Sequence, residues 1–244
     1  MTFIEEKIRI ACEKLKEFTE IGWQKIENVE MVRCGYKTEN RPPQEGFVPV
    51  VNGAPMEFAA DEHAWFRFSV EIPPIKANES MYLRLTTSRE GSWDATNPQG
   101  MVFIDGKSCL QGLDTNHTEI ELTPSKKNIS IYFYAGMSNA VLFPCFALVT
   151  KNNDAEKLYY DLGVAFAAMK LLDKNSSTYA AVCSVLDRAC MLLDFRGLRS
   201  PEFYESVKAA DAFMEEEYFD KLCGKAPAAD GTISLIGHTH IDVA

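Results

Sequence analysis

Hydrophobic residues recur every three or four positions at the start of the chain and after residue 151, and every second position between these regions. The spacing of three and four predicts a helix over residues 4–18 with one apolar face. Two later stripes predict helices over residues 158–172 and 179–193. A third helix is expected to begin at Ser200-Pro201, because serine is a favoured N-cap and proline suits the first helical position, and to end at Gly224.

The period of two indicates strands. In residues 65–72, apolar side chains alternate with polar ones, and Pro73-Pro74 ends the run. Similar runs follow at residues 81–86, 101–104, 117–122, 128–135 and 141–150. Asp105-Gly106 is typical of a tight type I′ hairpin turn. Seven or eight short strands predict an antiparallel β-sandwich of jelly-roll type. Its expected core residues are Phe66, Phe68, Val70, Leu83, Leu85, Ile131 and Phe133.

These patterns predict a mainly β chain with added helices, in four segments. Residues 1–24 are a helix and lead-in, residues 25–150 the sandwich, and residues 151–228 a helical connector, in which we expect Leu158, Leu162, Phe166 and Leu186 to be buried. Residues 229–244 contain an apolar run without alternation, typical of a buried parallel strand. Such a strand needs neighbours, so we expect it to be the first strand of a truncated α/β barrel.

Composition and charge narrow the class of protein. The chain has 244 residues, 46% hydrophobic and 25% charged, as in an ordinary globular protein. A net charge of −10 without a basic run disfavours binding to nucleic acid or to an anionic membrane. No apolar run is long enough to span a bilayer, and the first residues lack the apolar core of a signal peptide. Seven scattered cysteines without a C-x-x-C pair indicate reduced thiols and a cytoplasmic location.

Concentrated site chemistry occurs at His238-Thr239-His240-Ile241-Asp242. On a strand, His238, His240 and Asp242 project to the same side, because side chains alternate. Imidazole nitrogen and carboxylate oxygen both suit Zn²⁺. The ends of barrel strands are also where active sites lie. The motif therefore predicts a metal site, and its spacing leaves metal-dependent amidohydrolases and other barrel hydrolases open.

Other polar residues carry weaker signals. His63 and His117 are single histidines without a partner at ligand spacing, which favours structural roles in strands or loops. Trp93 and Asp94 lie in a loop with glycine and proline and are candidates for sugar contact, because aromatic rings stack on the apolar faces of pyranoses. The favoured alternative is that this loop packs against the expected barrel.

Residues 237–244 resemble the opening catalytic motif of glycoside hydrolase family 38, the class II α-mannosidases, in its cytosolic and bacterial branch. Segments at 64–73, 97–100, 103–106 and 111–117 are similar to the N-terminal sandwich of that branch, and residues 160–162 to its helical connector. The resemblance implies a zinc-dependent retaining exo-α-mannosidase that hydrolyses terminal α-mannosyl residues of oligosaccharides.

The resemblance also implies roles for individual residues. His240 and Asp242 would be zinc ligands. His238 would lie next to these ligands without binding the zinc, or beside the sugar. The nucleophile and the general acid would lie downstream, so this chain holds no catalytic residue of its own. We therefore expect it to be inactive alone and to bind Zn²⁺ weakly.

Two other readings stay open. The chain could instead be a carbohydrate-binding or interaction sandwich, or part of another metal-dependent barrel hydrolase. Self-association into a homo-oligomer is compatible with each of them.

Overall fold

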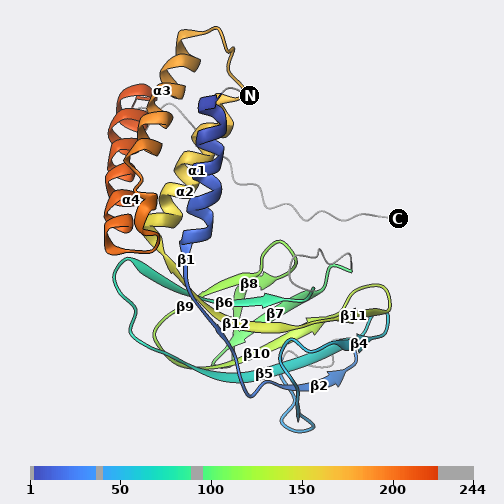
Figure 1. Cartoon of the computed structure of the whole chain (residues 1–244). Coiled ribbons are helices and arrows are strands. Elements are labelled where there is room, and N and C mark those ends of the chain that lie inside the picture. The colour runs from blue at the N-terminus through green and yellow to red at the C-terminus, as the bar shows by residue number, and fades with distance from the viewer. Residues whose placement is uncertain (1–2, 37–40, 89–95, 225–244) are drawn as a thin grey trace. The chain divides into compact units, whose positions relative to one another are not determined.

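The computed structural model describes residues 3–36, 41–88 and 96–224 (Figure 1). The chain divides into two compact units. The sandwich unit comprises Lys14–Glu156, and the helical unit comprises Met1–Glu13 together with Lys157–Ala244. The helical unit is therefore discontinuous in sequence, with the sandwich unit inserted between its two parts.

The sandwich unit contains two large antiparallel sheets and one small one. The six-stranded sheet has the order β3 (Val48–Pro49), β2 (Glu30–Cys34), β5 (His63–Ile72), β10 (Ser125–Tyr134), β7 (Gln99–Ile104) and β8 (Lys107–Leu113). The four-stranded sheet has the order β1 (Glu20–Lys25), β12 (Cys145–Asn152), β6 (Glu79–Thr86) and β9 (Glu119–Leu122). The small sheet pairs β11 (Ala140–Leu142) with β4 (Met56–Phe58).

The two large sheets pack face to face, which confirms the predicted sandwich (Figure 1). The ring of Phe146 on β12 lies 5.1 Å from those of Phe66 and Phe68 on β5, so aromatic contacts join the sheets. From β5 onward, successive strands often switch between the sheets, as in a jelly roll. All seven predicted core residues are buried in this one cluster.

The predicted hairpin turn is confirmed, because Asp105 and Gly106 have φ angles of +51° and +77°. The strand predicted over residues 141–150 is instead two strands that belong to different sheets. The break falls at Phe143 and Pro144. The Phe143 N–H donates to Thr87 O, and the carbonyl of Pro144 accepts from Gly53 N–H. Proline lacks the N–H that a continuous ladder needs, so β11 ends before it.

The predicted helices are present. They are α1 (Phe3–Thr19), α2 (Asn153–Met169), α3 (Ser177–Leu192) and α4 (Pro201–Phe213), with a 3₁₀ turn at η1 (Phe195–Gly197). A π-helical segment, η2 (Met214–Leu222), continues α4. The Ser200 hydroxyl caps α4 by accepting from Phe203 N–H at 3.2 Å, as the sequence predicted. None of the described helices is long and apolar enough to cross a membrane.

Two polar contacts join α1 to α3 inside the helical unit. The Lys7 ammonium lies 2.7 Å from the Asp187 carboxylate, and the Tyr179 hydroxyl donates to the buried Glu5 carboxylate at 2.7 Å. The side chains expected to be buried in the helical region, Leu158, Leu162, Phe166 and Leu186, are buried.

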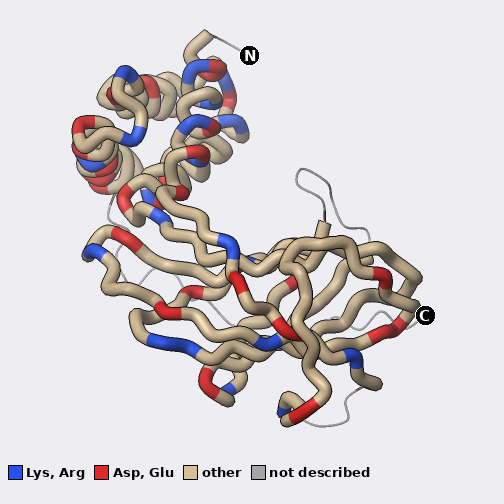
Figure 2. The backbone as a smooth tube through the Cα atoms, turned by 60° about the horizontal axis from the view of Figure 1, so that its bottom comes forward, with Lys and Arg blue, Asp and Glu red and all other residues tan. Residues whose placement is uncertain are grey.

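An ionic network lies on the outer face of the four-stranded sheet. The Glu119 carboxylate accepts from Arg84 Nε and pairs with the Lys151 ammonium, each at 2.7 Å. Arg84 also pairs with Glu20, and Lys151 pairs with Glu156 at 2.8 Å. Along the described chain, positive and negative residues are interspersed (Figure 2). The seven cysteines are unpaired.

Candidate functional site

The residues to which the sequence assigned metal or sugar contacts lie outside the described ranges. They are His238, His240 and Asp242 in the C-terminal segment, and Trp93 and Asp94 in the sequence between β6 and β7. The predicted barrel strand at residues 229–244 falls in the same C-terminal segment. The candidate site is therefore built from residues that the sequence analysis read as structural or did not single out.

An open groove of about 990 Å³ lies on the outer face of the six-stranded sheet. On β5 and β10, Phe66 and Phe133 face the core, so the alternate positions face away from it. Register places His63 opposite Tyr134, and Trp65 opposite Tyr132. Strands β7 and β8 supply the far wall, and the groove is lined in addition by Tyr36, Asp61, Asp114 and His117.

Aromatic rings gather around His63. Its ring stacks on Tyr132 with centroids 5.2 Å apart and an interplanar angle of 13°. Tyr134 is tilted against it at 5.0 Å, and Tyr36, two residues after β2, meets it edge-on at 5.5 Å. His63 is only 6% exposed, whereas Tyr36 is 77% exposed. The groove thus has one exposed ring, Tyr36, and two half-buried tyrosine rings around the buried His63.

The aromatic row continues away from the groove and becomes covered. Trp65 packs against Tyr132 at 5.2 Å and Phe103 at 5.4 Å, and it is only 2% exposed. Farther along β5, the Arg67 guanidinium lies over the ring of Phe47 at 4.0 Å. Of this aromatic row, His63, Tyr132 and Tyr134 line the groove, and Trp65 does not.

Two carboxylates stand at the groove. Asp61 accepts a hydrogen bond from the Tyr134 hydroxyl at 2.8 Å, and this bond raises the pKa of Tyr134. Asp114 accepts from the backbone N–H groups of Asn116 and His117, each at 2.7 Å, and lies 3.1 Å from Nδ1 of His117. Partial burial opposes ionisation of Asp114, but these hydrogen bonds outweigh it and lower its pKa. Both carboxylates are therefore fixed in position.

His63 has an unsatisfied polar atom. Its Nδ1 is buried and has no hydrogen-bond partner among the described residues. Burial lowers the pKa of His63, although the charge of Asp61 partly opposes this. A buried polar atom without a partner is costly, and such atoms concentrate at functional sites. His63 thus lines the groove with its ring while its Nδ1 stays buried and unpaired among the described residues.

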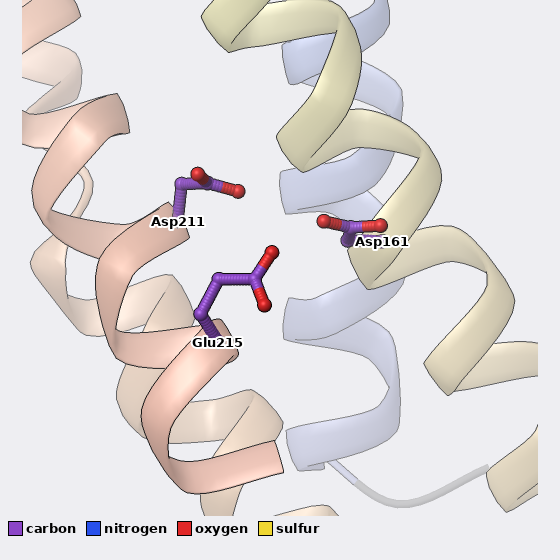
Figure 3. A group of neighbouring side chains, drawn as sticks. All are labelled: Asp161, Asp211 and Glu215. Atoms are coloured by element: carbon purple, nitrogen blue, oxygen red, sulfur yellow. The ribbon is translucent and has the colours of Figure 1, made fainter. Parts of the chain in front are cut away.

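A second cluster of charged residues belongs to the helical unit. Carboxylate oxygens of Asp161, Asp211 and Glu215 lie within 4.8 Å of one another (Figure 3). The Lys157 ammonium is bound to all three, at 2.9, 2.6 and 2.7 Å respectively. Burial opposes the charge of Lys157, but hydrogen bonds to the carboxylates outweigh it and raise its pKa. This cluster already holds a cation from the chain itself, so we assign it a structural role.

Sequence reasoning missed the groove for a specific reason. Tyr132 and Tyr134 occupy the outward positions of β10, where a half-buried strand ordinarily carries polar side chains. Outward aromatic residues two apart on a strand are the signal that was available. His63 and His117 do lie in a strand and a loop as expected, but both line the same groove.

Comparisons with known proteins identify no family. No protein-family model matches the chain, and no curated protein matches it. Among solved structures, a β-glucuronidase from an uncultured Clostridium sp. is similar with a TM-score of 0.33 and 9% identity, over 53% of this chain and 29% of that one. A family 35 carbohydrate-binding module from an environmental isolate has a TM-score of 0.27 and 9% identity, over 55% of this chain and 94% of that one.

A family 35 carbohydrate-binding module from Clostridium thermocellum has a TM-score of 0.27 and 8% identity, over 52% of this chain and 97% of that one. The chain thus spans less than a third of the glucuronidase and nearly the whole length of each module. Similarity at this level does not place the chain in a family.

Proposed function

We propose that the sandwich unit binds carbohydrate and that the groove at His63 is its ligand site. The observation that carries the proposal is the meeting of accessible aromatic rings with fixed carboxylates in one open groove. A pyranose ring has apolar C–H faces that pack on aromatic rings, and hydroxyl groups that need hydrogen-bond partners. The groove offers both kinds of contact side by side.

The dimensions and polarity of the groove support this function. Its volume of about 990 Å³ is at the upper end of the range typical of small-ligand pockets, roughly 300–1,000 Å³. The exposed Tyr36 ring can pack on a sugar, and the amides of Gln99 and Gln111 lie in the lining.

The proposal is tested by binding of the whole chain to an array of neutral and acidic oligosaccharides that includes mannotriose, cellotriose and galactotriose. We expect binding by the unmodified protein and a loss of about fivefold or more in affinity for Tyr36→Ala, since stacking on an aromatic ring contributes about 1 kcal/mol or more. Trp23→Ala is the matched control. Trp23 is 56% exposed on β1, in the other sheet.

Absence of binding to every sugar on the array would refute the proposal. Equal losses for Tyr36→Ala and Trp23→Ala would also refute it, because the groove would then have no special role. Circular dichroism of each variant checks that the fold is retained.

A second function is favoured by the sequence of residues 237–244. We propose that this chain forms the N-terminal part of a cytoplasmic, zinc-dependent retaining α-mannosidase acting on α-mannoside oligosaccharides. The support is that the motif containing His238, His240 and Asp242 resembles the opening catalytic motif of glycoside hydrolase family 38. Among the described residues, the three neighbouring carboxylates that could hold a metal are bound to Lys157, so the zinc proposal rests on the motif alone.

This second proposal has its own experiment. In the full-length protein that carries this sequence, Asp242→Ala should abolish both zinc content and hydrolysis of an aryl α-mannoside. Titration of Zn²⁺ into residues 1–244 alone should show weak binding, because His240 and Asp242 supply only two ligands. Retained zinc and activity in the full-length Asp242→Ala variant would contradict the assignment of these residues.

A further inference from the structure

The charges around the groove are of one sign. Among its described lining residues are two carboxylates, Asp61 and Asp114, and neither lysine nor arginine. Two arginines of the same sheet are already paired. Arg67, on the outer face of β5, binds the Glu30 carboxylate at 2.6 Å, and Arg33 on β2 is bound to Glu62. A ligand in the groove would therefore meet negative charge without a free guanidinium or ammonium among these groups.

The two carboxylates are held where they stand. The Tyr134 hydroxyl holds Asp61 at 2.8 Å, and three groups of the 116–117 turn hold Asp114. Neither carboxylate can turn away from a ligand without giving up these hydrogen bonds. An ionised carboxylate accepts hydrogen bonds and donates none, so its natural ligand partners are hydroxyl and amine donors.

We infer that the groove selects sugars without negative charge and rejects those that carry a carboxylate, sulfate or phosphate. The inference rests on the proposed carbohydrate-binding function and names the chemical class of its ligand. A neutral hydroxyl gains a charge-assisted hydrogen bond from Asp61 or Asp114. An anionic group at the same place meets repulsion and has no cation to pair with, which is expected to weaken binding about tenfold.

The test uses matched pairs of ligands. Mannotriose, cellotriose and galactotriose are each compared with the counterpart in which the C6 hydroxymethyl groups are oxidised to carboxylates. Dissociation constants are measured by calorimetry with the whole chain at about pH 8, above the ordinary titration range of imidazole. We expect the neutral member of the bound pair to bind about tenfold more tightly, and the ratio to shrink at high ionic strength.

Two isosteric variants assign the effect to the groove. Asp61→Asn and Asp114→Asn keep an oxygen that can accept the existing hydrogen bonds, and each should reduce the preference for the neutral sugar several-fold. Glu121→Gln is the matched control. It removes the same charge from an exposed position on β9, in the opposite sheet, and should leave the preference unchanged.

The outcomes separate the inference from the proposed function. Equal or tighter binding of the oxidised member, or a preference that survives in both Asn variants, overturns the inference and leaves carbohydrate binding intact. If the protein binds none of the three pairs of sugars and no other oligosaccharide on the array, the proposed function is overturned, and the inference with it. A preference that Glu121→Gln reduces as much as Asp61→Asn would show an effect of net charge and overturn the assignment to the groove.

Discussion

Replacement of Glu119 by glutamine tests the ionic network on the outer face of the four-stranded sheet. The substitution keeps the size of the side chain and removes its charge. Glu119 then loses charge-assisted hydrogen bonds from Arg84 and Lys151, each at 2.7 Å. Such bonds contribute about 1.5–3 kcal/mol each when intact.

The loss is smaller than their sum for two reasons. The glutamine oxygen still accepts a hydrogen bond, and both cations keep a second carboxylate, Glu20 for Arg84 and Glu156 for Lys151. The network is also partly open to solvent, which weakens each pair. We therefore expect the free energy of unfolding to fall by about 1–2 kcal/mol at neutral pH.

The effect must depend on pH. Burial opposes the charge of Glu119, but hydrogen bonds from Lys151 and Arg84 outweigh it, and its pKa is lowered from the ordinary value of 4.5. A lowered pKa in the folded state means that the carboxylate stabilises the fold fully above pH 4.5, and that this contribution is lost as the pH falls through the folded pKa. The difference between the two proteins should therefore shrink below pH 4.5.

Urea unfolding followed by tryptophan fluorescence measures this difference. All three tryptophans lie in the sequence of the sandwich unit, so the signal reports on that unit. Glu121→Gln, exposed on the same strand, should change the free energy of unfolding by less than about 0.5 kcal/mol. A Glu119→Gln variant as stable as the unmodified protein, or a difference that persists unchanged at pH 3, roughly one to two units below the ordinary pKa, would refute this reasoning.

Three further substitutions test other parts of the fold. Phe68→Ala, in the buried core, should lower the free energy of unfolding by about 3–5 kcal/mol in the same urea experiment, and a loss below about 1 kcal/mol would contradict its place in the core. Gly136→Ala should cost about 2 kcal/mol or more, because Gly136 has a φ angle of +117° and a Cβ there would lie 2.5 Å from Thr96 O. The neighbouring Met137→Ala, at an 82% exposed position, is its control and should have little effect. Lys157→Met should lower the melting temperature measured by circular dichroism, since three carboxylates lose their shared cation, and Ca²⁺ should then restore it. Equal responses to Ca²⁺ in the variant and the unmodified protein would show that Lys157 does not occupy a cation position.

The sandwich could be predicted from sequence because its determinants are local. Alternation places Phe66, Phe68 and Ile131 on one face of each strand, and Asp105-Gly106 accepts the positive φ angles of the turn. The switch between sheets at Pro144 was not predicted. The same period of two runs on both sides of it, and periodicity does not say which sheet a strand joins.

The groove could not be predicted in the same way. Its centre depends on the register that sets His63 opposite Tyr134, two residues far apart in the chain. A shift of one residue in that pairing would turn either side chain to the other face of the sheet. The buried, unpartnered Nδ1 of His63 is likewise a property of the packed structure, and a lone histidine in sequence carries no sign of it.

The insertion of the sandwich between α1 and the remaining helices has a consequence for how the chain folds. The contacts of Lys7 with Asp187 and of Glu5 with Tyr179 close a loop that contains the whole sandwich sequence. While that sequence is unfolded, the closure carries a large entropy cost. Once β1 and β12 have paired, with Glu20 opposite Lys151, the two ends of the insertion are held side by side and the cost falls. During synthesis α1 is made before its partner helix, and prior folding of the sandwich lowers the entropy cost of bringing the two together.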